Sequence, residues 1–534
     1  MPAGPAPTGS SSSTPGRRRL APAALALPLV AANLGLLLVF DLAHHMALTL
    51  ALLGAAFLGL LFVAPRLEAA RGPIGGAVLL GALMLRLPLL PLPPTLSDDV
   101  LRYLWDGKVA AAGMNPYTLA PEAAKLTPLR DEIWRRLPHQ QVPTVYPPLS
   151  LAAFSIAIRL PFPMLAWKLI ATGADLAACW LLLLAAARLG LPPGRAIWYA
   201  WNPLVALEVA GMGHVDALGV AAVVAAVLLL LPRARPLPAG TAAAAGALAK
   251  LVPLAALPRW ARQSGRPGRF LTAALGLTAV AALPVVAATG GVPPGLVAYG
   301  VSWEFNGPLF EPLWRLLAAI HAAPALARGL DRLKAATEIW HGLNFLYPYL
   351  YPQFLAKLLL ALGMAAAVAL SLRERDPVAG TGRLFGRLLL CSATVYPWYL
   401  LWVLPWAALR REGAWLALSG LILLSYLPQF LGISLWPWAY LVIWGPFFAM
   451  LLISDRYKRP FGASPHSPGP SLPASPPSRR ERGERSVKNR FLPFLWLSPS
   501  SPVRSGGRPG EEGRGDEGQP AGDAGAADSG RGTP

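Results

Sequence analysis

The chain has 534 residues, of which 54% are hydrophobic and only 14% are Asp, Glu, Lys or Arg. A soluble protein of this length would carry nearer a quarter of charged residues, so the composition excludes an ordinary soluble domain. The net charge of +20 comes largely from basic loops and a basic tail, which the positive-inside rule explains, so we expect no nucleic-acid partner.

The two ends of the chain are poor in the residues that build a core. Residues 1–19 are rich in Pro, Gly, Ser and Thr and finish in the basic cluster Arg17–Arg19. Residues 460–534 are rich in Pro, Ser, Gly, Arg and Asp. Such compositions are typical of disorder, so we expect disordered cytoplasmic segments over 1–19 and 460–534, and a membrane-embedded domain over 20–453.

Apolar runs close to the roughly 20 residues that cross a bilayer recur through the central part of the chain. Basic residues mark one side of these runs, so the positive-inside rule places both termini in the cytoplasm. The predicted crossings are residues 20–40, 46–64, 74–94, 164–188, 196–212, 216–231, 270–290, 351–372, 414–431 and 434–453. Two large loops, 97–146 and 291–350, then fall on the extracytoplasmic face.

Three further apolar pieces do not fit a simple crossing. The run 238–257 contains Lys250 and has Arg clusters at both ends, so one crossing would leave one cluster outside. The run 384–409 is flanked in the same way, and 148–161 is too short to span. Half-helices that enter and leave on one face satisfy these features. We therefore expect an all-α polytopic membrane protein with roughly 10–13 transmembrane or re-entrant helices.

The most unusual charges are two adjacent carboxylates, Asp98 and Asp99, directly after the apolar run 74–94. Charges at the mouth of a span are costly unless they are solvated or used. After Ser97 they suit a helix N-terminus, because Ser is a good N-cap and acids complement the helix dipole. A carboxylate at a membrane interface can instead serve as a general base toward an attacking hydroxyl. Both interpretations fit these residues taken alone.

The residues after the acid pair have helical spacing. One stripe is apolar, which predicts a helix that lies on the membrane face, and it consists of Leu101, Leu104, Trp105 and Val109. Asp98, Arg102 and Asp106 recur every four residues, which places an arginine between two acids. Either Arg102 or Lys108 would be able to bind a phosphate.

Other polar residues lie within or beside apolar runs. His214 and Asp216 sit at a predicted outer junction, where a buried structural histidine and a polar active-site wall are both possible. For Lys250 the alternative to a functional role is snorkelling to the headgroups. Trp303, in the second large loop, suits either an acceptor sugar or a membrane interface.

The segment SDDVLRYLWDGKVAAAGMNPY (97–117) resembles the first periplasmic loop of GT-C superfamily glycosyltransferases, and most closely the bacterial polyprenyl-phosphate-mannose-dependent mannosyltransferase-like group. Five further blocks follow in the family's order: PHQQVPTVYPPLS (138–150), YAWNPLVALEVAGMGHVDALG (199–219), ALAKLVPLAALP (247–258), SWEFNGPLF (302–310) and TVYPWYLLWVLP (394–405). The first and third blocks are the most specific, and together the blocks lie between residues 74 and 409.

This resemblance implies a GT-C-like fold with a catalytic Asp in the first extracytoplasmic loop, here Asp98 or Asp99. It implies transfer of a hexose, mannose first among the candidates, from a polyprenyl phosphate to a glycan or glycolipid acceptor, with inversion. The expected donor or phosphate contacts are Arg102, Lys108, His139, Tyr146, His214 and Lys250. The expected acceptor contacts or wall residues are Asp106, Asn115, Asp216, Trp303, Glu304, Asn306, Tyr396 and Trp398.

Several points stay open at this stage. The leaving phosphate needs a positive partner or a divalent cation, Mg²⁺ or Mn²⁺, and no metal ligands are identified. Tyr396 stands where many relatives have His, so its role toward the donor is uncertain. The expected location is the plasma membrane of a bacterial-type cell, multi-pass, with an extracytoplasmic site. The alternative is a transporter or lipid-linked-sugar flippase, which would share the broken spans.

Overall fold

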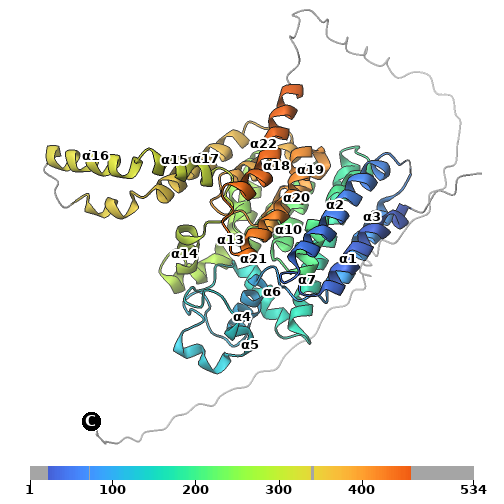
Figure 1. Ribbon diagram of the computed structural model, residues 1–534, viewed down its shortest axis with the longest axis horizontal. Coiled ribbons are helices and arrows are strands. Elements are labelled where there is room, and N and C mark those ends of the chain that lie inside the picture. The colour runs from blue at the N-terminus through green and yellow to red at the C-terminus, as the bar shows by residue number, and fades with distance from the viewer. Residues whose placement is uncertain (1–21, 71, 232, 338–341, 459–534) are drawn as a thin grey trace, which may run out of the picture. The chain divides into compact units, whose positions relative to one another are not determined.

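The computed structural model describes residues 22–70, 72–231, 233–337 and 342–458, which Figure 1 shows as an assembly of helices. Within these ranges no strand is present, and isolated bridges pair Thr394 with Phe305 and Asn306. The predicted segments 1–19 and 460–534 lie outside the described residues. The all-α class expected from the sequence is confirmed.

Apolar helices dominate the described chain. Five segments are long and apolar enough to cross a membrane: α2 (Met46–Glu68), α7 (Pro163–Arg188), α13 (Pro267–Thr289), α17 (Pro352–Ser371) and Gly413–Leu431. Shorter apolar helices lie at Ala24–Val39, Gly75–Leu89, Pro148–Ala157, Asp216–Leu230 and Trp438–Ile453. This set identifies an integral membrane protein of many helices.

Two predicted crossings are less regular than expected. The run 74–94 forms α3 (Gly75–Arg86) and a 3-10 turn, η2 (Leu87–Leu89), and then loses helical structure where prolines remove backbone donors. The run 196–212 divides into α8 (Ile197–Ala200), α9 (Pro203–Ala206) and a π-helical turn, η5 (Leu207–Gly211). The Asn202 side chain accepts a hydrogen bond from the Leu204 N–H at 3.0 Å and so caps α9.

Both long runs that were expected to break do so. Helix α11 (Pro236–Ala249) ends at Lys250, whose backbone is extended, and the chain resumes as η6 (Val252–Ala256) and α12 (Leu257–Gln263). Helix α18 (Pro377–Leu390) is likewise separated from η8 (Pro397–Trp402) and α19 (Leu404–Arg410). Each break leaves polar backbone and side chains inside the helical assembly.

A fully buried ion pair joins the N-terminal helices. Arg86 Nε of α3 lies 2.5 Å from Asp175 Oδ2 of α7, and neither side chain is exposed. The Tyr199 hydroxyl donates to the other oxygen of Asp175 at 2.7 Å, and Arg86 also donates to the Ala200 carbonyl at 2.8 Å. These bonds satisfy most of the polar groups that burial would otherwise leave without partners.

The first large loop folds onto the bundle. It contains α4 (Asp99–Ala111), η3 (Ala124–Leu129) and α5 (Glu132–Arg135), and α4 packs against α6 (Pro148–Ala157). A Cβ at Gly107 would lie 2.6 Å from the Phe154 backbone, so only glycine permits this close approach. The second loop holds α14 (Pro294–Ser302), α15 (Phe310–Ala319), α16 (Ala322–Thr337) and η7 (Asn344–Tyr349).

Candidate active site

The acid pair opens helix α4. Asp98 is the N-cap residue and Asp99 the first helical residue, while Ser97 Oγ accepts the Asp99 backbone N–H at 3.3 Å. The acids therefore do occupy a helix N-terminus, where their charge is favourable. The two side chains differ in surroundings, because Asp98 is exposed and Asp99 turns toward the helical assembly.

The apolar stripe of α4 does not lie on the membrane face as predicted. All its members are buried in the protein, and Leu101, Trp105 and Val109 pack with Leu126 and Leu137 of the same loop. The loop thus builds a small core of its own, which satisfies the stripe. Helical periodicity identifies an apolar face but does not identify what covers it.

The predicted arginine between two acids has a structural role. Arg102 Nε lies 2.9 Å from Asp106 Oδ1, and its Nη2 donates to the Val142 carbonyl at 2.6 Å. Asp106 is buried, and burial raises its pKa, although Arg102 acts in the opposite direction. Arg102 therefore ties α4 to the segment that carries His139 and Tyr146, while part of it still lines the cavity described next.

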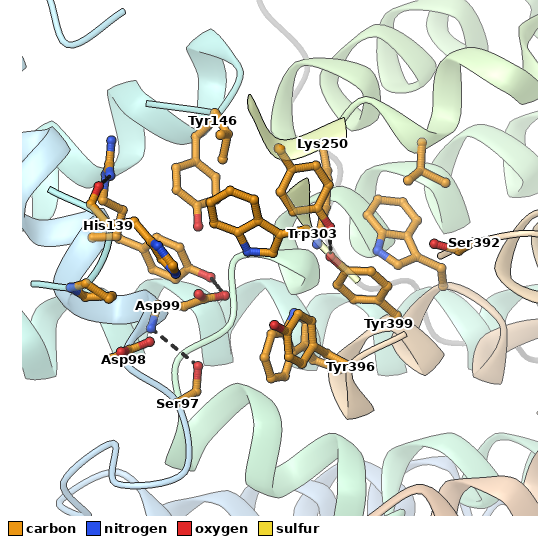
Figure 2. A pocket seen from close by; sticks show the side chains of 18 of the residues that line it. Ser97, Asp98, Asp99, His139, Tyr146, Lys250, Trp303, Ser392, Tyr396 and Tyr399 are labelled. Carbon is orange, nitrogen blue, oxygen red and sulfur yellow. Dashed lines mark hydrogen bonds between the residues drawn. The ribbon is translucent and has the colours of Figure 1, made fainter. Parts of the chain in front are cut away.

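A cavity of about 1030 Å³ lies against the N-terminus of α4. Its walls come from α4, the loop before α6, the break after α11, α14, α18 and η8, and Figure 2 shows it from close by. The predicted site residues that line it are Asp98, Asp99, Arg102, His139, Tyr146, Lys250, Trp303, Tyr396 and Trp398. Apolar side chains also line it, among them Leu254, Leu296, Met364, Phe385 and Leu389.

Asp99 is the carboxylate best placed in this cavity. Its Oδ2 accepts the Tyr103 hydroxyl at 3.4 Å and lies 3.7 Å from His214 Nδ1. Burial of the carboxyl, reinforced by the charge of Asp98, raises the pKa of Asp99 to about 7, although Lys250 acts to lower it. A carboxylate with such a pKa can exchange protons near neutral pH. Burial also raises the pKa of Asp98.

Lys250 is one of the basic residues that line the cavity. The break after α11 brings its ammonium within 2.7 Å of Asp216 Oδ1 and 4.6 Å of the Tyr399 ring centre. The same Asp216 oxygen accepts the Trp402 indole N–H at 2.5 Å. Asp216 is fully buried, whereas the Lys250 side chain is 23% exposed and lines the cavity. Asp216 thus lies behind the wall and holds the lysine in place.

Aromatic rings form much of the remaining wall. The His139 ring lies 4.7 Å from the ring of Trp303, and Tyr396 stacks on Trp398 at 4.5 Å with the two planes 1° apart. Tyr299 and Tyr399 also line the cavity, and their hydroxyls contact each other. Such surfaces suit the apolar faces of sugars while their hydroxyls find polar partners.

The other predicted site residues do not line the cavity. Lys108 pairs with Asp131 at 2.7 Å, and Glu304 pairs with Lys357 at 2.8 Å. The side chains of Asn115 and Asn306 accept hydrogen bonds from other parts of the protein.

Specifically, Asn115 Oδ1 accepts the Tyr117 backbone N–H at 2.9 Å, whereas the buried Asn306 accepts the Trp444 indole N–H at 2.8 Å. Asp106 and Asp216 lie behind the walls, as does His214, which is fully buried. The sequence prediction therefore mixed residues of the cavity surface with residues that support it.

Several cavity and supporting residues were not singled out from the sequence. Tyr399 and Trp402 fall within the quoted block 394–405, so their proximity to Tyr396 was a usable signal. Tyr299 and Arg136 carry no local pattern that marks them, and they reach the cavity only through the folding of two separate loops.

The acids around the cavity bear on the divalent cation that the sequence left open. No cluster of three or more His, Cys, Asp or Glu side chains with metal-binding geometry occurs among the described residues. The acids that line the cavity are Asp41, Asp98 and Asp99, and its cations are Arg102, Arg136 and Lys250. Since Mg²⁺ is commonly held by one or two carboxylates together with substrate phosphates, the Mg²⁺ or Mn²⁺ left open above stays a prediction.

Residues 20–263 match the family model described as "Alpha-(1->6)-mannopyranosyltransferase, N-terminal domain". With the apolar helices, this match defines the class of the protein as an integral-membrane glycosyltransferase of the GT-C type. Over those residues, which make up less than half of the chain, the sequence is similar to the alpha-(1->6)-mannopyranosyltransferase family. No significant match to the chain was found among curated proteins or solved structures. The matched stretch contains Asp99 and Lys250 but ends before Trp303.

Proposed function

We propose that this enzyme transfers mannose from a polyprenyl phosphate to a glycan or glycolipid acceptor at the extracytoplasmic face, with inversion at the anomeric carbon. The family description adds an α-(1→6) linkage as the product expected. The observation that carries the proposal is that Asp99, Lys250 and a set of apolar side chains line one cavity. These three features match the parts of a lipid-linked sugar: the carboxylate matches the attack on the anomeric carbon, the ammonium the phosphate, and the apolar side chains the lipid chain.

In the proposed reaction, Asp99 takes the proton of the acceptor hydroxyl as that oxygen attacks the anomeric carbon. The bond from this carbon to the phosphate oxygen breaks, and its electron pair leaves with the polyprenyl phosphate. Lys250 stabilises the charge that develops on the phosphate. One base suffices, in contrast to the paired carboxylates of glycoside hydrolases.

Asp99 is proposed as the base in preference to Asp98. Its Oδ2 already contacts Tyr103 and approaches His214, whereas Asp98 is exposed at the N-cap position. The raised pKa of Asp99 also matches proton transfer near neutral pH. Asp98 then contributes through its charge, which favours the protonated form of its neighbour.

The test uses purified wild-type protein, Asp98→Asn and Asp99→Asn, with polyprenyl-phosphate mannose and an oligomannoside acceptor. Loss of a general base reduces the rate by roughly 10²–10⁴-fold, so Asp99→Asn is expected to fall by that factor and Asp98→Asn by much less. Product is measured by mass spectrometry after confirming that each variant is folded. Wild-type rates from both folded variants would refute the catalytic assignment.

The side of the membrane is tested separately. A single cysteine at Ser97 is expected to react with a membrane-impermeant thiol reagent added outside intact cells. Reaction only in inverted vesicles would place the acid pair in the cytoplasm and contradict the proposed face.

A further inference from the structure

Behind Asp99 lies a buried polar group that the proposed reaction does not use. His214 is fully buried, with Nδ1 3.7 Å from Asp99 Oδ2 and Nε2 3.2 Å from Glu208 Oε2. Glu208 is also fully buried, and its other oxygen accepts the Tyr426 hydroxyl at 2.9 Å. Asp99, His214, Glu208 and Tyr426 therefore form a chain from the cavity wall into the core.

The backbone is shaped to bring His214 to this place. Glu208 lies in the π-helical turn η5, and its carbonyl accepts the His214 N–H at 2.9 Å. Gly213, between them, has φ +78°, which residues with a side chain rarely adopt. A Cβ at this position would also lie only 3.3 Å from the Trp167 ring. π-Helical turns recur at functional sites because they displace residues from the regular ladder.

A stack of rings holds the imidazole from the side. Phe305 stacks on Tyr396 at 4.5 Å, Tyr396 on Trp398 at 4.5 Å, and Trp398 on His214 at 3.8 Å. The stack fixes the plane of the ring, and each of its nitrogens lies near a carboxylate oxygen, at 3.7 Å for Nδ1 and 3.2 Å for Nε2. Neither nitrogen makes a hydrogen bond that meets strict geometric criteria. Buried polar atoms without partners are costly, so their retention indicates a role beyond packing.

The chemistry of imidazole limits how protons are shared in this chain. A neutral ring has one N–H, so it cannot donate to two ionised carboxylates at once. The His214 contacts with Asp99 and with Glu208 can both be satisfied when the three groups share two protons, one on the ring and one on a carboxyl. A charge costs more at Glu208, which is fully buried, than at Asp99, which opens onto the cavity. The second proton therefore lies on Glu208, and the Nδ1–H of His214 faces an ionised Asp99.

Other titratable groups also face Asp99. Asp98 and Tyr103 do so from α4 and Tyr146 from the loop before α6, while Tyr299 lies on α14. Tyr396 and Tyr399 approach from η8.

Lys250 and Asp216 face both Asp99 and the His214–Glu208 pair, but they bind each other. Among the described basic side chains, His214 brings a nitrogen, Nδ1, within 3.7 Å of the Asp99 carboxylate.

We propose that His214 and Glu208 form a positioning pair that holds Asp99 ionised and oriented toward the acceptor hydroxyl. This inference rests on the proposed role of Asp99 as the base. It differs from the sequence prediction, in which His214 binds the donor phosphate. The pair acts through Asp99 and does not contact substrate.

The test is the pH dependence of kcat/KM for purified wild type, His214→Phe, Glu208→Leu and Tyr426→Phe, with Asp99→Asn measured alongside. Phenylalanine preserves the stack on Trp398 but removes the N–H. Without this N–H, whose dipole favours the ionised carboxylate 3.7 Å away, the acidic limb of the profile is expected to move to higher pH. Glu208→Leu is expected to follow, and Tyr426→Phe to move the limb less in the same direction.

The matched control is Ser425→Ala, a buried neighbour of Tyr426 on the same helical segment, which is expected to keep the wild-type limb. Tyr426→Phe removes one oxygen and keeps the test available if the larger changes prevent folding. An unmoved limb in every folded variant would overturn the inference, as would a raised donor KM with no shift. An Asp99→Asn variant with the wild-type rate would instead refute the proposed function itself.

Discussion

The ammonium of Lys250 lies 2.7 Å from the carboxylate of Asp216, which is fully buried behind the cavity wall. One oxygen of Asp216 serves both Lys250 and the Trp402 indole, and the other has no hydrogen-bond partner. The lysine is thereby held at the break after α11, with two of its three N–H donors left for a ligand. An oriented ammonium of this kind is suited to a phosphate.

Replacing Lys250 by Met should weaken donor binding. A hydrogen bond to a charged group contributes about 1.5–3 kcal/mol, so the donor KM or Kd is expected to rise roughly 10- to 100-fold. The matched control is Lys108→Met, because Lys108 pairs with Asp131 away from the cavity and its loss should leave donor binding unchanged. Equal effects from the two variants would show that Lys250 has no special relation to the donor.

The pH dependence of activity should report Asp99. Its pKa is raised to about 7, so the ionised, proton-accepting form increases as pH rises through 7, and kcat/KM should increase with it. Wild type is expected to lose activity about tenfold for each pH unit below that value. A profile that stays flat between pH 5 and 8, with folded protein throughout, would separate Asp99 from the proton transfer.

The same pKa shift has a consequence for stability. The folded state binds the Asp99 proton more tightly than the unfolded state, in which the carboxyl has a pKa near 3.8. The stability that protonated Asp99 contributes is therefore lost as pH rises from about 4 to about 7. Asp99→Asn removes the buried charge and should be at least as stable as wild type at pH 8. Thermal unfolding in detergent at pH 5 and pH 8 measures this. A strongly destabilised Asp99→Asn at pH 8 would contradict it.

The sequence was sufficient to predict the class of fold, the two helix breaks and the acid pair, because each has a local cause. Lys250 was found for the same reason: a lysine within an apolar run is costly wherever it lies. The stripe of α4 was placed on the membrane because periodicity does not reveal that Leu126 and Leu137 return to cover it. Arg86 and Asp175, 89 residues apart, give no local sign that they will meet.

The Arg86–Asp175 pair, which does not line the cavity, should be important for the stability of the fold. Arg86→Met leaves a buried carboxylate without its cation and should cost about 3–5 kcal/mol. The double change Arg86→Met with Asp175→Leu removes both charges and should recover much of that loss. Thermal unfolding of wild type, the two single variants and the double variant gives the coupling. A double variant as unstable as the sum of the singles would show that the pair does not act as a unit.

Tyr396 should act through its ring more than through its hydroxyl. It lies between Phe305 and Trp398 in the stack that ends at His214, where a histidine was expected from the family resemblance. Tyr396→Phe keeps both stacking contacts and should retain most of the activity. Tyr396→Ala removes two aromatic contacts of about 0.5–1.5 kcal/mol each, so the support of Trp398 and His214 weakens. Comparing the kcat and the thermal stability of the two variants tests this. A Tyr396→Phe variant as impaired as Tyr396→Ala would instead assign the role to the hydroxyl.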